Sequence, residues 1–206
     1  MTDPDSNDRP RAFDLSDLPI HDAEETPVSP IDAARRRSSA AARDPDGNGA
    51  VPVGIADYVV VDDSTPLKTS GLGSCIGVVV HDEAATVSGL LHFMLPRADE
   101  AHSGNHPDAK FADTGFEAMF AEFRDLGGRP SRSWAKGAGG ATMVEFAETS
   151  RSIGARNVEA VRRELEFYGV SIAGTDFGGH HGRSIEFDPA TGTLTVNGAD
   201  GVERTL

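Results

Sequence analysis

Cys75, the only cysteine of the chain, stands where a glycine-rich loop at residues 71–74 gives way to a strongly apolar run. At such a junction, backbone N–H groups can point outward and stabilise an oxyanion beside an exposed thiol. A lone cysteine is more often a small buried hydrophobe. The surroundings of Cys75 instead favour a nucleophile that attacks a carbonyl carbon.

A nucleophilic thiol needs a base, and His92 is the candidate because it lies inside the apolar run 89–95. If adjacent strands bring the imidazole to the thiol, ion pairing lowers the thiol pKa from about 8.5 toward roughly 3.5 to 7.5. We therefore expect Cys75 to be a thiolate at neutral pH. Taken alone, a histidine satisfied within the core is an equally good interpretation of His92.

Runs rich in β-branched and aromatic residues predict about eight strands. The runs at 75–81 and 88–95 are separated by a turn at 82–85 and predict the hairpin that carries Cys75 and His92. The other predicted strands lie at 56–61, 67–69, 133–138, 141–146, 170–173, 184–187 and 193–196, the last two joined by a turn at 188–192.

Two helices are predicted from apolar spacing. Over residues 112–126, apolar side chains recur every three or four positions, and glycines 127 and 128 supply a stop. A second helix is predicted to begin with Asn157 as its N-cap and to end at Gly169. Hairpin strands with only two long helices favour an α+β fold, a sandwich of mixed or antiparallel β-sheet covered by two main helices, over a doubly wound α/β fold.

Residues 1–50 are rich in Asp, Pro, Ser, Ala and Arg and show no sustained apolar period. We predict that they form a disordered acidic N-terminal extension. Residues 51–206 are predicted to form one folded domain, large enough to bury a core without a disulfide or a structural metal.

The charge balance bounds the function. With 33 acidic and 19 basic residues the formal net charge is −14, which argues against nucleic acid as a partner. The basic residues are nearly all Arg, and such an acidic, Lys-poor composition suggests a halophilic source. The acidic start lacks the positive region of a signal peptide, and no apolar stretch approaches the ~20 residues that span a bilayer. We expect a cytoplasmic protein with no insertion into the membrane.

Two motifs contain the candidate nucleophile and base: Thr-Ser-Gly-Leu-Gly-Ser-Cys at 69–75 and Leu-His-Phe-Met-Leu-Pro at 91–96. Together they resemble the signature of the CheD family of chemoreceptor glutamine deamidases. Similar motifs follow in the family's order, and they lie at 111–114, 139–141, 153–161 and 178–187. Phe111 departs mildly from the family, which usually has a tyrosine there. The resemblance extends from about residue 54 to the C-terminus.

The resemblance implies roles for individual residues. Cys75 is the nucleophile, and His92 is the general base and acid. Thr69 orients the imidazole, by geometry more than by charge because a hydroxyl is neutral; an ordinary threonine at a strand end is the other interpretation. The backbone N–H groups of Gly73, Ser74 and Cys75 are expected to hold the oxyanion.

The motif at 178–187 supplies two candidate substrate contacts. By resemblance, His180 lines the substrate groove, whereas Arg183 either clamps a substrate carbonyl or pairs with Glu186. A metal site at His102 and His106 is disfavoured, because that loop is polar and lacks a cysteine or a convincing third ligand. No metal and no organic cofactor are expected.

The activity implied by the resemblance is deamidation of specific glutamine side chains to glutamate on methyl-accepting chemotaxis receptors, through a thioester on Cys75. The expected partners are the cytoplasmic domains of these receptors and a CheC-like phosphatase. The main alternative is a non-catalytic chemotaxis adaptor that binds a CheC-type phosphatase. A thiol acyltransferase of the transglutaminase type would share the thioester but pass it to an amine.

Overall fold

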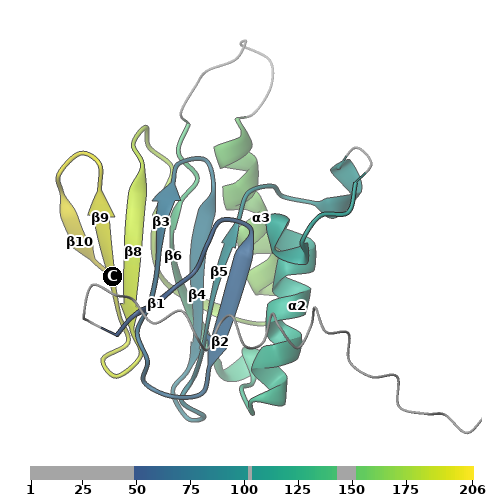
Figure 1. Cartoon of the computed structure of the whole chain (residues 1–206), viewed down its shortest axis with the longest axis vertical. Coiled ribbons are helices and arrows are strands. Elements are labelled where there is room, and N and C mark those ends of the chain that lie inside the picture. The colour runs from purple at the N-terminus through teal and green to yellow at the C-terminus, as the bar shows by residue number, and fades with distance from the viewer. Residues whose placement is uncertain (1–48, 102–103, 143–151) are drawn as a thin grey trace, which may run out of the picture. The chain divides into compact units, whose positions relative to one another are not determined.

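The structure of the protein, a computed structural model, describes residues 49–101, 104–142 and 152–206. Nearly all of the predicted N-terminal extension therefore lies outside the described residues. The described part contains two β-sheets of five strands each and two α-helices (Figure 1). The α+β sandwich is confirmed, although it contains two sheets.

The first sheet is the one that carries the candidate nucleophile and base. Its strands, in spatial order, are β2 (Asp57–Val61), β5 (Val87–Phe93), β4 (Ile76–Asp82), β6 (Trp134–Gly139) and β7 (Ser171–Phe177). Neighbours are antiparallel except for β6 and β7, which are parallel. The connection between these two strands contains the helix α3 (Ile153–Phe167), the usual form of crossover for a parallel pair. The predicted hairpin is the central β4–β5 pair.

The second sheet lies against the first. Its strands, in spatial order, are β1 (Val51–Pro52), β3 (Leu67–Leu72), β8 (Arg183–Asp188), β9 (Thr193–Gly198) and β10 (Glu203–Thr205). Only β1 and β3 are parallel; β3–β8, β8–β9 and β9–β10 are antiparallel. The predicted turn at 188–192 joins β8 to β9.

Two α-helices cover the outer face of the first sheet, α2 (Ala112–Asp125) and α3 (Ile153–Phe167) (Figure 1). Three short 3-10 turns complete the described elements: η2 (Ala98–Glu100), η3 (Asp108–Lys110) and η4 (Pro130–Arg132). Among the described residues, no helix combines the length and the apolar character that a membrane crossing needs.

The two faces of the first sheet have separate cores. Leu91 and Phe93 of β5 pack with Phe116 and Phe120 of α2 on the helix side. Leu90 belongs to the cluster between the two sheets. Because both faces are covered, every residue of β4 and β5 is buried. Burial of a typical large apolar side chain contributes about 1.5 to 3 kcal/mol, so this double core fixes the register of the hairpin.

Several predicted boundaries differ from the structure. The second helix begins four residues before Asn157, and its N-cap is Ser152, whose hydroxyl accepts a hydrogen bond from Ala155 N. A strand was expected at 141–146, but Ala141 and Thr142 are not in a strand, and residues 143–146 lie outside the described residues. The expected strand at 170–173 begins one residue later and continues to Phe177.

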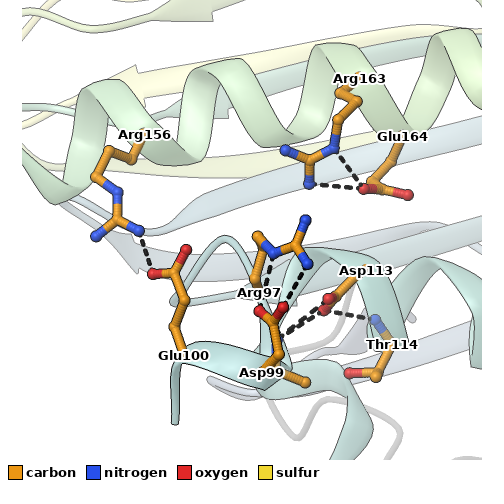
Figure 2. Close-up of polar contacts among 9 residues, drawn as sticks. Arg97, Asp99, Glu100, Asp113, Thr114, Arg156, Arg163 and Glu164 are labelled. Carbon is orange, nitrogen blue, oxygen red and sulfur yellow. Dashed lines mark hydrogen bonds and ion pairs between the residues drawn. The ribbon is translucent and has the colours of Figure 1, made fainter.

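Polar contacts join the segment after β5 to the two helices (Figure 2). Asp113, in the first turn of α2, accepts a hydrogen bond from Ala98 N at 3.1 Å. Arg156, in the first turns of α3, forms an ion pair with Glu100 of η2. Both partners of this pair are partly exposed, so we assign it a small stabilising effect. These contacts link the first turns of α2 and of α3 to the chain that follows β5.

Candidate active site

Cys75 and His92 lie on the same face of the first sheet. His92 is directly opposite Gly77 in the β4–β5 ladder, and opposite residues project to the same side. Cys75 is two residues before Gly77 and packs with the cluster between the sheets. The two side chains are therefore diagonal neighbours across a glycine, an arrangement that long or aromatic side chains can bridge.

Gly77 is a glycine because the second sheet comes close there. A Cβ atom at this position would lie 2.8 Å from Ile185 Cδ1 and 3.0 Å from Leu72 Cδ1. A larger residue would force the side chains of Ile185 and Leu72 to move. It would also place a side chain beside the imidazole of His92, on the side where Cys75 lies.

The hydroxyl of Thr69 fixes the tautomer of His92. Thr69 Oγ1 lies 2.7 Å from the carbonyl oxygen of Val53, to which it can only donate. Because that uses the single hydroxyl proton, the contact of 2.8 Å between Oγ1 and His92 Nδ1 must be donated by Nδ1–H. In the neutral ring, Nε2 then carries the free lone pair.

Burial keeps this imidazole neutral. His92 is fully buried, and burial lowers its pKa to about 4. Its Nε2 atom is buried without a hydrogen-bond partner among the described residues. Because an orphaned buried polar atom is costly, it calls for an explanation. The predicted role of His92 as a base explains the unpaired Nε2, because a base needs a lone pair that is free to accept a proton.

The expectation of a resting thiolate has to be corrected. Cys75 is half-buried, and burial raises the pKa of its thiol, an effect only partly offset by a hydrogen bond from its own backbone N–H. The same desolvation disfavours the imidazolium of His92. The environment therefore favours the neutral thiol of Cys75 and the neutral imidazole of His92.

The loop that presents Cys75 is tied to the turn after β6. Gly140 N donates to Cys75 O and Ala141 N donates to Gly73 O, each at 2.8 Å. Gly139 has a φ of +115°, and a Cβ there would lie 2.2 Å from Cys75 O. Glycine is thus required at 139 on two counts, backbone conformation and space. The motif at 139–141 is therefore hydrogen-bonded to the loop that contains Cys75.

Asn157 was predicted to cap a helix, but in the structure it contacts the segments that carry Cys75 and His92. It is fully buried on α3, and its Nδ2 donates to Ser74 O and to Met94 O, each at 2.8 Å. These carbonyls flank the nucleophile and the base along the chain. The sequence offers no distinct signal for this contact, because an Asn near the start of a helix is normally interpreted as a cap.

Gly73, Ser74 and His180, also predicted for the site, lie in or beside the loop that contains Cys75. Gly73 and Ser74 are half-buried, and Gly73 N already donates to Gly71 O at 3.0 Å. His180 is exposed, and its Nδ1 lies 3.3 Å from Thr142 O, beside the turn that supports Cys75. The structure thus places His180 near the turn that contacts the Cys75 loop, and its contact with a substrate stays a prediction.

Arg183 acts as a tie between strands. Its side chain is 2% exposed, it pairs with Asp176 of β7, and its Nη1 donates to His181 O at 3.0 Å. Its carboxylate partner in the structure is thus Asp176, whereas the sequence suggested Glu186. Buried and engaged in this way, Arg183 is better placed to hold β7 to β8 than to meet a substrate.

Within the described residues, no group of three or more histidine, cysteine or acidic side chains could hold a metal ion. His106 lies 3.2 Å from Lys110 Nζ and packs edge-on against Phe111. His102 lies outside the described residues.

Comparison with known proteins places this arrangement in a family. Residues 94–198 match the family model for CheD, described as CheD chemotactic sensory transduction. That match begins just after His92, whereas the full-length relatives match over about three quarters of the chain. Among solved structures, Neisseria meningitidis protein NMB0706 has a TM-score of 0.42 and 12% identity over 63% of this chain and 64% of its own, too little to carry an argument.

The curated relatives carry consistent names. A probable chemoreceptor glutamine deamidase CheD of Haloarcula marismortui is 46% identical over 76% of this chain and 89% of its own. A probable CheD of Geobacillus kaustophilus is 44% identical over 73% and 93%, respectively. The chemoreceptor glutamine deamidase CheD of Halalkalibacterium halodurans is 40% identical over 72% and 93%. The chain described here belongs to the CheD family.

Proposed function

We propose that this protein is a protein-glutamine glutaminase, which hydrolyses glutamine side chains of chemotaxis receptors to glutamate and ammonia. The names of its relatives supply the substrate class. The observation that carries the mechanism is the hydrogen-bond chain from Val53 O through Thr69 to His92, which leaves Nε2 free on the face that Cys75 shares.

In the first step, His92 Nε2 takes the thiol proton of Cys75 as Sγ attacks the carboxamide carbon. The C=O double bond opens to an oxyanion, held by the backbone N–H groups of Ser74 and Cys75, since that of Gly73 is engaged within its own turn. Charging the buried imidazole is unfavourable alone, but the negative charge formed in the same step offsets this cost.

The second half regenerates the enzyme. The protonated Nε2 of His92 donates its proton to the leaving nitrogen, the C–N bond breaks, and ammonia departs from a thioester on Cys75. His92 then takes a proton from water as the water attacks the thioester. The C–S bond breaks, glutamate is released, and the thiol recovers its proton. Thr69 holds the ring through both steps.

The substrates are expected in the cytoplasm, as cytoplasmic domains of receptors, and His180 is the candidate contact with them because it is exposed beside the site. The adaptor interpretation, in which the chain chiefly binds a CheC-like phosphatase, makes no use of the free Nε2. The acidic balance of the chain makes molar salt the appropriate assay condition, because it screens repulsion between surface charges.

The test is to mix the protein with a purified receptor cytoplasmic domain at molar salt and to follow ammonia release and conversion of glutamine to glutamate by peptide mass spectrometry. Wild-type protein should deamidate, and Cys75→Ser should lose nearly all turnover because a hydroxyl is far less acidic than a thiol. Deamidation that survives Cys75→Ser would remove the mechanism. Binding of a CheC-type phosphatase without ammonia release would favour the adaptor.

A further inference from the structure

The Asn157 side chain bridges two chain segments at the point where the β4–β5 ladder ends. The last pair of that ladder is Ile76 with Phe93. Just beyond it, the amide of Asn157 donates to Ser74 O on one side and to Met94 O on the other. Only the NH₂ end of the amide can donate to two carbonyls, so these contacts set the orientation of the side chain.

The bond to Ser74 O also fixes the peptide that joins Ser74 to Cys75. A peptide unit is planar and trans, so its C=O and N–H point in opposite directions. With Ser74 O held toward α3, the N–H of Cys75 points away from the helix. That N–H is one of the two assigned to the oxyanion, and it also lies close enough to interact with the thiol of its own residue.

The helix that carries Asn157 is fixed independently of this contact. A Cβ at Gly154 would lie 2.4 Å from both Gly140 O and Ala141 O, so the first turn of α3 packs directly on the turn after β6. Arg156 adds its ion pair with Glu100 on the other side (Figure 2). Asn157 therefore projects from a support that already contacts the segments on both sides.

We propose that Asn157 is a positioning residue of the deamidation site: its amide holds the Ser74–Cys75 peptide and the end of β5 together, so that the Cys75 N–H faces the oxyanion and the thiol stays in register with His92. The inference rests on the proposed function. It assigns to Asn157 no contact with substrate; the residue acts through Cys75 and His92.

Two variants test the role. Asn157→Ala removes both donors, and Asn157→Asp keeps the shape while placing an oxygen against two carbonyls. Misplacement of a reacting group by about 1 Å can cost about 100-fold, so kcat should fall roughly 10- to 100-fold with KM changed less than about 3-fold. The larger loss is expected for Asn157→Asp.

Alkylation by iodoacetamide gives a readout that a merely structural role would not change. Cys75 is the only thiol, so the rate reports this site alone, without receptor. When the Ser74–Cys75 peptide is free to turn, its N–H no longer favours the thiolate. The pH midpoint of alkylation should then rise by about half a unit or more.

The matched control is Val161→Ala, one turn along α3, where the side chain is buried in the helix-side core away from the site. All rates are taken per titratable thiol, below the unfolding temperature of every variant. If both Asn157 variants match Val161→Ala in kcat and in alkylation midpoint, the role is refuted, while the requirement for Cys75 stands. If Cys75→Ser still deamidates, the proposed function itself fails.

Discussion

The two ends of the β4–β5 hairpin each bury a histidine beside a hydroxyl, but of the two, only His92 has a buried ring nitrogen without a partner among the described residues. Near the turn, His81 is 2% exposed, with Nδ1 2.9 Å from Ser88 Oγ and its ring edge-on to Trp134 and Phe187. At the open end, His92 is held by Thr69 and retains a buried Nε2 with no partner in the described part of the chain.

The difference comes from what lies opposite in the ladder. His81 is opposite Ser88, whose side chain fills the space beside it, whereas His92 is opposite Gly77, which has no side chain. The hydroxyl that contacts His92 comes from the second sheet, not from the ladder. A buried histidine on an apolar strand is thus poor evidence of catalysis. A buried histidine with one nitrogen fixed by a hydroxyl and the other buried without a partner is much better evidence.

The largest expected difference between the two histidines is in kcat when each is replaced by glutamine. His92→Gln removes the base and should lower kcat by about 1,000-fold or more, since general base catalysis contributes about 10² to 10⁴ and the thiol cannot act alone. His81→Gln should keep kcat per folded molecule within about 3-fold, because His81 belongs to the core. Its cost is expected in unfolding free energy, about 1 to 3 kcal/mol, measured in urea.

The outcome that would contradict this pairing is a His81→Gln protein that folds but loses as much turnover as His92→Gln. Turnover would then depend on the hairpin as a whole, and the unpaired Nε2 of His92 would not mark the catalytic histidine. Ammonia release per titrated thiol, at molar salt, gives the comparison directly.

The hairpin itself was predictable because two long apolar runs with a polar turn between them fit few other structures. The second sheet was harder to recognise. Its outer strands β1 and β10 span two and three residues, too short for a period to show. One signal was present: β4 and β5 are apolar almost throughout, without the alternation of a half-exposed strand, and such strands are covered on both faces.

The candidate residues could be named before the structure, whereas their electrostatics could not. The surroundings of Cys75 and His92 and the family resemblance of Thr69 nominated these three residues, and the structure brings Thr69 to His92 across two sheets. That contact depends on the packing of β3 on β5, which no local pattern encodes. The resting thiol was missed because desolvation depends on the surrounding atoms. Asn157 was assigned to a cap because Asn favours caps, and its burial follows only from the tertiary fold.

A second, smaller effect on kcat is expected when the hydroxyl of Thr69 is removed. Thr69→Val keeps the shape but removes the acceptor for His92 Nδ1–H, so the ring can turn or take the other tautomer, and kcat should fall roughly 10- to 100-fold. Thr69→Ser retains the hydroxyl and should stay within about 3-fold of wild type. Nitrogen chemical shifts of the labelled ring would report the tautomer. Equal activity of the valine and serine variants would show that Thr69 only fills space.

The smallest effect at neutral pH, and the one that separates the two histidines without any substrate, is the dependence of stability on pH. Burial lowers the pKa of His92 from 6.5 to about 4, so between these values the unfolded chain binds more protons than the folded one. The free energy of unfolding should therefore fall as pH drops from about 6.5 toward 4, by up to about 3 kcal/mol from this residue.

His92→Gln should remove that part of the slope in urea titrations across the pH range. His81→Gln should remove less. Burial also lowers the pKa of His81, but the neighbouring carboxylates of Glu83 and Asp82 oppose that shift. Contributions from the many surface carboxylates are common to all variants and cancel in the difference. If the two glutamine variants lost equal slope, the two histidines would be equally costly to charge. The contrast between the hairpin ends would then rest on the free Nε2 alone.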